Sequence, residues 1–244
     1  MPLAAGYAFG YRDSAFWGMV ALQAKCKNPV KHFTGSIMSV YPTSTLYFLT
    51  QYAYDKAPLF AEAADKRLLI AKMLETKKVF HLDIAAYVIL DNHMHWLISS
   101  PQSNGVTAVI NHFRGAVQRD WRKAMPEREE AKIWSSASRL TTLHGSVELR
   151  NHMDFIHYDA VRHGLVSRAT DYPWSSLPLR VEQGRYPERW GEVAPPAAVA
   201  RVVSAYKHRA SSLRSNGIFD ETLDETLDET PMNLKTAVTR RFVA

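Results

Sequence analysis

The sequence predicts an α+β protein in which short strands alternate with amphipathic helices. The clearest strand is Thr45–Tyr54, a run of aromatic and β-branched residues. The clearest helix is Ala61–Thr76, where Ala, Leu and Ile recur at helical spacing opposite Lys and Glu. The composition, 46% hydrophobic and 22% charged over 244 residues, is ordinary for a soluble globular chain that buries a core.

A β-hairpin within Asp83–Pro101 is the central predicted element. Two β-rich runs, Ala86–Leu90 and His93–Ile98, flank the pair Asp91-Asn92, which suits a tight turn. The sequence therefore places two adjacent antiparallel strands in the middle of the fold.

The second strand of this hairpin carries a His-x-His pair. Side chains two residues apart leave the same face of a strand, so His93 and His95 share one face and Met94, Trp96 and Ile98 share the other. Two imidazoles on a rigid strand are suitable ligands for a divalent metal. The competing interpretation is one hydrogen-bonded core histidine and one exposed histidine.

The remaining elements follow from periodicity and end signals. Ser103-Asn104-Gly105 can cap the next helix, and Gly164 suits a helix C-terminus. The predicted elements are a helix over Val106–Met125, a short strand within Ile133–Leu143, a helix over Val147–His163, an irregular stretch over Leu165–Pro187 and a helix over Pro195–Arg214.

The charge distribution favours a polyanionic partner. The formal net charge is +6, but six of the 24 acidic residues lie in Asp220–Glu229. Residues 1–219 consequently carry 27 basic residues against 18 acidic ones. Such a bias is typical of nucleic-acid-binding proteins, although it also serves solubility alone.

One side of the Val106–Met125 helix is basic. Two interpretations of this side remain open: a solvated surface, or a phosphate-contacting surface beside the metal site. The candidate DNA-binding residues are Arg114, Arg119, Arg122 and Lys123.

Several classes of site and location are excluded or disfavoured by what the sequence contains. A single cysteine, Cys26, excludes an internal disulfide and indicates a reducing compartment. No apolar run reaches the length of a membrane helix, so we expect a cytoplasmic protein without a membrane partner. P-loop, Rossmann, Cys-x-x-Cys and nucleophile-elbow motifs are also missing from the sequence.

Three segments in order resemble the REP-associated tyrosine transposases, which are single-tyrosine HUH transposases of the small insertion-sequence type. The first, Ala86–Ile98, resembles the family's strand with paired histidines. The second, Asp154–Val166, resembles its catalytic helix and the following turn. The third, Tyr172-Pro173-Trp174-Ser175-Ser176, resembles its closing turn.

This resemblance implies a fold and a domain organisation. The expected fold is a ferredoxin-like antiparallel sheet with helices packed on one face, plus N- and C-terminal extensions. The expected segments are an N-terminal extension over 1–37, a transposase-like domain over 38–191, a C-terminal helix over 192–219 and an acidic low-complexity tail over 220–244.

The resemblance also implies a chemistry. His93 and His95 match the family's metal-binding pair, and Asp159 falls at the third ligand, one helical turn after the nucleophile. The implied cofactor is Mg²⁺ or Mn²⁺, which polarises the scissile phosphate. The implied partner is single-stranded DNA with hairpins, bound in the bacterial cytoplasm at the nucleoid by a monomer or a homodimer.

The nucleophile position departs from the family. Phe155 stands where the family has its tyrosine, and phenylalanine has no hydroxyl with which to form a phosphotyrosine link. Three accounts are open: an engineered exchange, a natural member that binds DNA without cutting, or replacement by Tyr158 one turn along. Ala160, where the family usually has proline, favours natural divergence.

Besides a purely structural protein in which the His-x-His pair arose by chance, three functions therefore compete. The first is a transposase-like protein with a missing nucleophile, and the second is a domesticated DNA-binding module without catalysis. The third is a metal-dependent phosphoesterase using activated water, with His152 or His157 as base.

Overall fold

The computed structural model describes residues 45–100, 105–124 and 131–215, in which strands alternate with helices. The strands are β1 (Thr45–Ala53), β2 (Asp83–Ile89), β3 (His93–Ser100) and β4 (Trp134–Leu143). The helices are α2 (Ala63–Val79), α3 (Val106–Ala124), α4 (Gly145–Arg162), α5 (Leu177–Glu182) and α6 (Ala197–Ser215), with 3-10 turns η2 (Tyr54–Lys56) and η4 (Ala169–Asp171).

The four strands form one antiparallel sheet in the order β2-β3-β1-β4. Along the chain the elements from β1 to β4 run β-α-β-β-α-β, which is the ferredoxin-like arrangement. The prediction of an α+β fold with an antiparallel sheet is therefore confirmed. The hairpin is β2 and β3, so the His-x-His strand occupies an inner position of the sheet.

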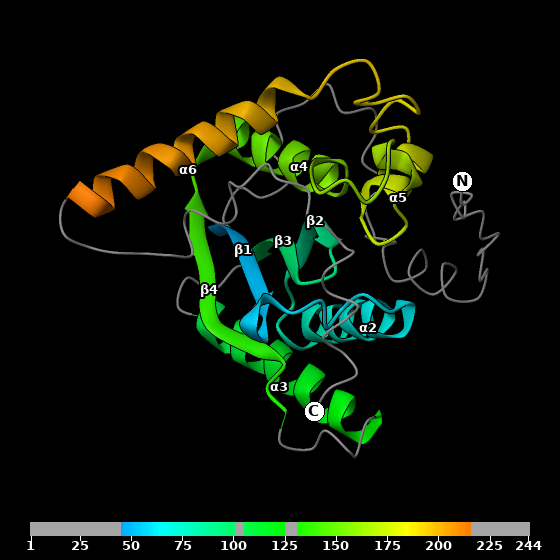
Figure 1. Cartoon of the computed structure of the whole chain (residues 1–244), viewed down its shortest axis with the longest axis vertical. Helices are drawn as coiled ribbons and strands as arrows, with labels where there is room; N and C mark the ends of the chain where they lie inside the picture. Colours follow the sequence, from blue (N-terminus) through cyan, green and yellow to red (C-terminus); the bar gives the residue numbers. More distant parts are fainter. Residues whose placement is uncertain (1–44, 101–104, 125–130, 216–244) are drawn as a thin grey trace, which may run out of the picture. The chain divides into compact units, whose positions relative to one another are not determined.

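Helices cover both faces of this sheet (Figure 1). On one face the ring of Trp96 in β3 lies 5.0 Å from the ring of Phe113 in α3. On the other face the ring of His95 lies 5.6 Å from the ring of Phe155 in α4. Helices α2 and α3 pack on one face of the sheet, as expected. Helices α4 and α6 cover the second face, which the expectation of helices on one face did not include.

Double coverage explains the burial of β3. All eight of its residues are buried, so the strand lacks the polar, exposed face of a sheet with one open side. His93 is 4% exposed and His95 is 1% exposed. The interpretation in which one of these histidines faces solvent is therefore wrong.

Two predicted elements differ from those observed. The strand expected to be short within Ile133–Leu143 is ten residues long in β4 and pairs with β1 along most of its length. The stretch Leu165–Pro187, expected to be irregular, contains the six-residue helix α5 with proline in its first turn. A helix of six residues is too short to show a hydrophobic period in the sequence.

The C-terminal helix joins the main core. Val199, Val202, Val203 and Tyr206 of α6 belong to the same cluster of buried apolar residues as Phe48 of β1. The predicted extensions over 1–37 and 220–244 lie outside the described residues. Of the helices that the structure describes, none is long and apolar enough to cross a membrane.

The closing turn seals the outer edge of β2. The backbone N–H of Ile89 donates to the carbonyl of Trp174, and the hydroxyl of Tyr172 donates to the carbonyl of Ile89 at 2.6 Å. The N–H of Ser176 donates to the carbonyl of Tyr87. Because an open edge strand exposes unpaired backbone groups, this turn protects the hairpin that carries the histidines.

Candidate metal centre

Each histidine of β3 has a polar partner that holds its Nδ1 atom. The Nδ1–H of His93 donates to Oδ1 of Asn92 at 2.7 Å, and Nδ1 of His95 is hydrogen-bonded to Oγ1 of Thr50 at 2.9 Å. Thr50 lies directly opposite His95 in the β1–β3 register. A partner on Nδ1 fixes the orientation of the ring and leaves Nε2 free as a ligand.

The turn before His93 is fixed by a buried lysine. Nζ of Lys66 in α2 donates to Oδ1 of Asp91 at 2.6 Å and to the carbonyl oxygens of Phe60 and Ala61. The Lys66 side chain is 3% exposed, and these acceptors compensate its burial. The hairpin turn that presents His93 is thereby attached to α2.

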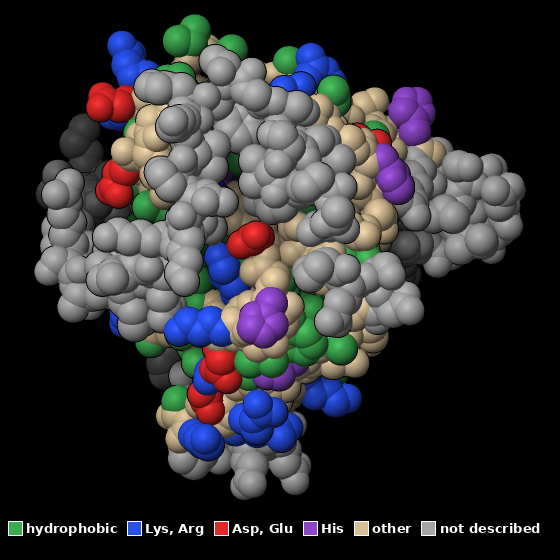
Figure 2. Space-filling model, turned by 180° about the vertical axis from the view of Figure 1, so that it is seen from behind, with side chains coloured by type: hydrophobic (Ala, Val, Ile, Leu, Met, Phe, Trp, Pro, Cys, Tyr) green, Lys and Arg blue, Asp and Glu red, His purple; other side chains and the backbone are tan. Residues whose placement is uncertain are grey.

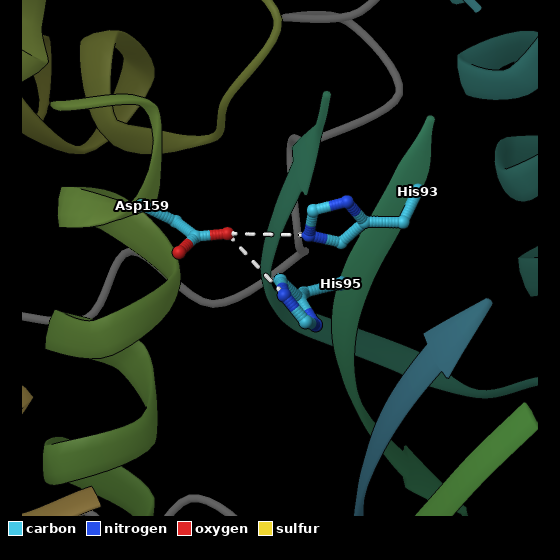
Figure 3. A group of neighbouring side chains, drawn as sticks. All are labelled: His93, His95 and Asp159. Carbon is cyan, nitrogen blue, oxygen red and sulfur yellow. Dashed lines mark ion pairs between the residues drawn. The ribbon is translucent and has the colours of Figure 1, made fainter. Parts of the chain in front are cut away.

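Helix α4 brings a carboxylate to the same place. Oδ2 of Asp159 lies 3.2 Å from Nε2 of His95 and 3.8 Å from Nε2 of His93 (Figure 3). The ligand atoms of the three side chains all lie within 4.8 Å of one another, and all three residues are buried. The structure thus brings together the three residues that the sequence selected as metal ligands.

The electrostatics keep the imidazoles neutral and the carboxylate charged. Burial lowers the pKa of His95, and burial together with the neighbouring His95 lowers the pKa of His93 well below its ordinary value. Burial alone would raise the pKa of Asp159, but the neighbouring His163 and Arg162 and the contact with His95 lower it overall. Neutral imidazole and ionised carboxylate are the forms that bind metal.

The donor set fits a divalent ion. Among the described residues, Nε2 of His93 and Oδ2 of Asp159 are buried without a hydrogen bond of ordinary geometry. Buried polar atoms of this kind need an explanation, and a cation between them supplies one. Two imidazole nitrogens and one carboxylate oxygen are ligands for Mn²⁺ and its neighbours, and the carboxylate also suits Mg²⁺.

Phe155 occupies the position next to these ligands. It lies one helical turn before Asp159, and its ring lies 5.6 Å from the ring of His95 and 6.1 Å from that of Phe48. The guanidinium carbon of Arg162 lies 4.7 Å from the centre of the Phe155 ring. A purely apolar side chain therefore stands where the resemblance places a nucleophile.

Tyr158 packs elsewhere. Its ring lies 6.2 Å from that of Trp190, and a Cβ atom on Gly191 would come within 3.1 Å of it. These contacts place the ring against the segment after α5. They argue against Tyr158 as a substitute for the missing tyrosine.

The two histidines considered as bases for a water-activating site are engaged in other contacts. Both ring nitrogens of His152 are hydrogen-bonded, Nδ1 to the carbonyl of Glu148 and Nε2 to the hydroxyl of Tyr206. Nε2 of His157 is hydrogen-bonded to Oγ of Ser176, which holds the closing turn. Neither arrangement supports a general base directed at the metal ligands.

The basic side of α3 is divided between two roles. The guanidinium of Arg114 donates to the carbonyl of Ser135 and lies over the ring of Trp134 in β4, so this half-buried side chain anchors α3 to the sheet. Arg119, Arg122 and Lys123 are exposed. Helix α3 lies on the Trp96 face of the sheet, opposite the face that carries Asp159, so these residues do not border the candidate metal centre.

One face of the molecule shows how positive and negative charges are distributed. On the face shown in Figure 2, Lys and Arg side chains are interspersed with Asp and Glu side chains, mostly in the lower part. This face therefore lacks a continuous basic patch among the described residues. The exposed end of α3 remains the basic surface that the sequence selected.

Two further residues of the centre were not selected from the sequence. Nη1 of Arg162 donates to Oδ1 of Asp159 at 2.5 Å, and Nε2 of His163 lies 3.8 Å from the same oxygen. Arg162 follows Asp159 by three residues and His163 follows it by four, and both spacings place side chains on one side of a helix. This spacing from Asp159 was the sequence signal from which the two residues could have been selected.

Comparisons with known proteins agree with this geometry. Residues 47–159 match the family described as "Transposase IS200 like". The chain is 28% identical over 125 residues to a Haemophilus influenzae protein assigned to the REP-associated tyrosine transposases, covering 48% of this chain and 71% of that protein. It is 26% identical over 143 residues to the REP-associated tyrosine transposase of Escherichia coli, covering 57% and 81%.

A solved structure gives the same result for the fold. The chain superposes on a REP-associated tyrosine transposase bound to a REP hairpin with a TM-score of 0.52 at 21% identity, covering 61% of this chain and 85% of that one. The family match begins in β1 and ends at Asp159, so it encloses the sheet, both histidines and the carboxylate. Over residues 47–159 this chain is therefore similar to the IS200-like transposases, and REP-associated tyrosine transposases are among the proteins that it resembles.

Proposed function

We propose that this protein binds hairpin-forming single-stranded DNA through its transposase domain and cannot form a phosphotyrosine link because Phe155 replaces the nucleophile. His93, His95 and Asp159 would hold a divalent ion, and this ion would supply charge neutralisation at a bound phosphate. A relative with the same fold is bound to a REP hairpin, which supports a hairpin as the ligand.

One observation carries this proposal. The ring of Phe155 lies against His95 and one helical turn from Asp159, while the three ligand side chains keep their mutual distances within 4.8 Å. Three side chains that could hold a metal ion are therefore close together although the reactive hydroxyl is missing, and this arrangement supports the proposal. A relic that had also lost metal binding would be under no constraint to keep two imidazoles and a carboxylate buried together.

The chain's own residues suit a role in orientation. Asn92 and Thr50 hold the rings of His93 and His95, and Arg162 holds one oxygen of Asp159. Each ligand is thereby fixed before an ion or a phosphate arrives, which reduces the cost of ordering the site on binding. The missing element is a nucleophile.

The decisive experiment restores that nucleophile. The full chain and Phe155→Tyr are incubated with Mn²⁺ and a labelled single-stranded DNA hairpin, and covalent protein–DNA adducts are separated by denaturing electrophoresis. We expect an adduct from Phe155→Tyr alone. A second variant, Phe155→Tyr with His95→Ala, should form none, because its metal ligand is missing.

The other outcomes discriminate between the alternatives. An adduct from the unaltered chain that disappears in Tyr158→Phe would make Tyr158 the nucleophile and refute the proposal. DNA binding without any adduct from Phe155→Tyr would support a non-catalytic module. Cleavage by the unaltered chain without an adduct would indicate hydrolysis by activated water.

A further inference from the structure

The side of α4 that faces β3 carries one more potential ligand than the three residues already described. Phe155, Asp159 and His163 follow one another at intervals of four residues, so they form one row along the helix. His163 is the C-cap residue, and its backbone N–H still donates to the carbonyl of Asp159 at 3.0 Å. The helical register therefore extends to His163.

The imidazole of His163 lies beside that of His93. Its ring centre is 5.1 Å from that of His93, nearly the same as the 4.9 Å between His93 and His95. Its Nε2 lies 3.8 Å from Oδ1 of Asp159, and Nε2 of His93 lies 3.8 Å from Oδ2. His163 therefore lies as close to the Asp159 carboxylate as His93 does, but its nearest oxygen is Oδ1 whereas that of His93 is Oδ2.

His163 is also the accessible member of the group. Its side chain is 19% exposed, whereas those of His93, His95 and Asp159 are 5% exposed or less. An ion entering from solvent would meet His163 first. The position at the C-terminal end of α4 is favourable for a cation as well, because the helix dipole is negative there.

We propose that His163 is a fourth protein ligand of the metal centre and that the resulting set of three imidazoles and one carboxylate selects a first-row transition ion over Mg²⁺. This inference rests on the metal centre of the proposed function. Imidazole nitrogen binds Zn²⁺, Cu²⁺ and Ni²⁺ well, whereas Mg²⁺ prefers oxygen ligands and keeps several waters. A third imidazole thus shifts the preference of the site.

The test measures metal affinity without DNA. The full chain, His163→Ala and His163→Gln are titrated calorimetrically with Zn²⁺ and with Mg²⁺. Loss of His163 should weaken Zn²⁺ binding by about tenfold or more, the scale seen for residues that support a metal site. Mg²⁺ affinity should change by less than about threefold, because Mg²⁺ gains little from imidazole.

Two controls make the result specific. His144→Ala removes an exposed imidazole from the other end of α4 and should leave both affinities unchanged. Circular dichroism and thermal melting of each variant report whether it folds, and His163→Gln keeps a polar side chain of similar length should His163→Ala be unstable. Pulsed electron paramagnetic resonance of the Cu²⁺ complex should count three bound imidazoles in the unaltered chain and two in His163→Gln.

The outcomes separate the two proposals. If His93→Ala with His95→Ala abolishes Zn²⁺ binding while both His163 variants bind like the unaltered chain, the three-residue centre stands and His163 is no ligand. If the double variant also binds Zn²⁺ like the unaltered chain, the metal centre of the proposed function is itself refuted.

Discussion

Oδ2 of Asp159 lies 3.2 Å from Nε2 of His95, which joins helix α4 to the inner strand β3 at a fully buried point. Both partners are rigidly mounted, one on a helix and the other opposite Thr50 in a paired strand. A cation at this point would connect the layer of α4 to the sheet. Its binding should therefore be detectable as a change in the stability of the fold.

The first prediction concerns that stabilisation. We expect Mn²⁺ to raise the melting temperature of the full chain, because a ligand at 100 times its Kd adds about 2.7 kcal/mol to the free energy of unfolding. His93→Ala combined with His95→Ala should remove this shift. Differential scanning fluorimetry measures it, with the exposed His208→Ala as control. An equal Mn²⁺ shift in the double variant would eliminate the site.

The second prediction concerns the groups that hold the imidazoles. Thr50→Val keeps the shape of the side chain but removes the hydroxyl that is hydrogen-bonded to Nδ1 of His95. Asn92→Ala removes the acceptor of His93. Each change should weaken Mn²⁺ binding by about 10–100-fold, because the ring loses its fixed orientation. Calorimetric titration checks this, and unchanged affinity in both variants would show that the rings are positioned by packing alone.

The third prediction concerns pH. Burial, followed by the charge of Arg180, lowers the pKa of His157 to about 3, whereas an unfolded histidine has a pKa of about 6.5. The unfolded chain therefore binds more protons between these values, and stability is lost as the pH falls from about 6.5 toward 3. For this residue alone the slope approaches about 1.4 kcal/mol per pH unit.

Urea unfolding at pH 7 and at pH 5 measures this slope. His157→Gln carries no titrating ring, so its stability should fall less over the same interval. The histidines of the metal centre also have lowered pKa values and contribute to the slope in both proteins. Parallel pH dependences of the two proteins would mean that His157 is protonated equally in the folded and unfolded states.

The sequence predicted the site well where local periodicity decides geometry. The two-residue period of β3 put His93 and His95 on one face, and the turn pair Asp91-Asn92 set the hairpin. The four-residue helical spacing placed Phe155 and Asp159 on one side of α4. These relationships need no knowledge of how the layers pack.

The packing of helices against the two faces of the sheet could not be predicted from local periodicity. The sequence does not state which face of the sheet a helix covers. It therefore left open a phosphate-contacting side of α3 beside the metal centre, although α3 lies across the sheet from that centre. Arg114 looked like a surface charge because its partners, Ser135 and Trp134, come from a distant strand. The engagement of His152 by Tyr206 likewise depends on the docking of α6.

The fourth prediction concerns the anchor of the hairpin turn. Lys66→Met should destabilise the protein by about 3 kcal/mol, because Asp91 and two backbone carbonyls lose a buried charged donor. Lys72→Met is the matched control on the same helix: Lys72 pairs with Glu75 and Asp120 nearer the surface, so its loss should cost about 1 kcal/mol or less. Chemical unfolding compares the two, and equal costs would contradict a special role for Lys66.

The fifth prediction concerns the basic end of α3. Arg119→Gln with Arg122→Gln should weaken binding of a single-stranded hairpin and reduce the slope of log K against log salt by about 0.7 for each phosphate that is no longer neutralised. Because α3 lies across the sheet from Asp159, Mn²⁺ affinity should not change. The control, Arg185→Gln with Arg189→Gln, removes the same charge from exposed positions after α5. Equal decreases of affinity in both pairs would mean that DNA responds to net charge, and an unchanged affinity in the α3 pair would make that side a solvated surface.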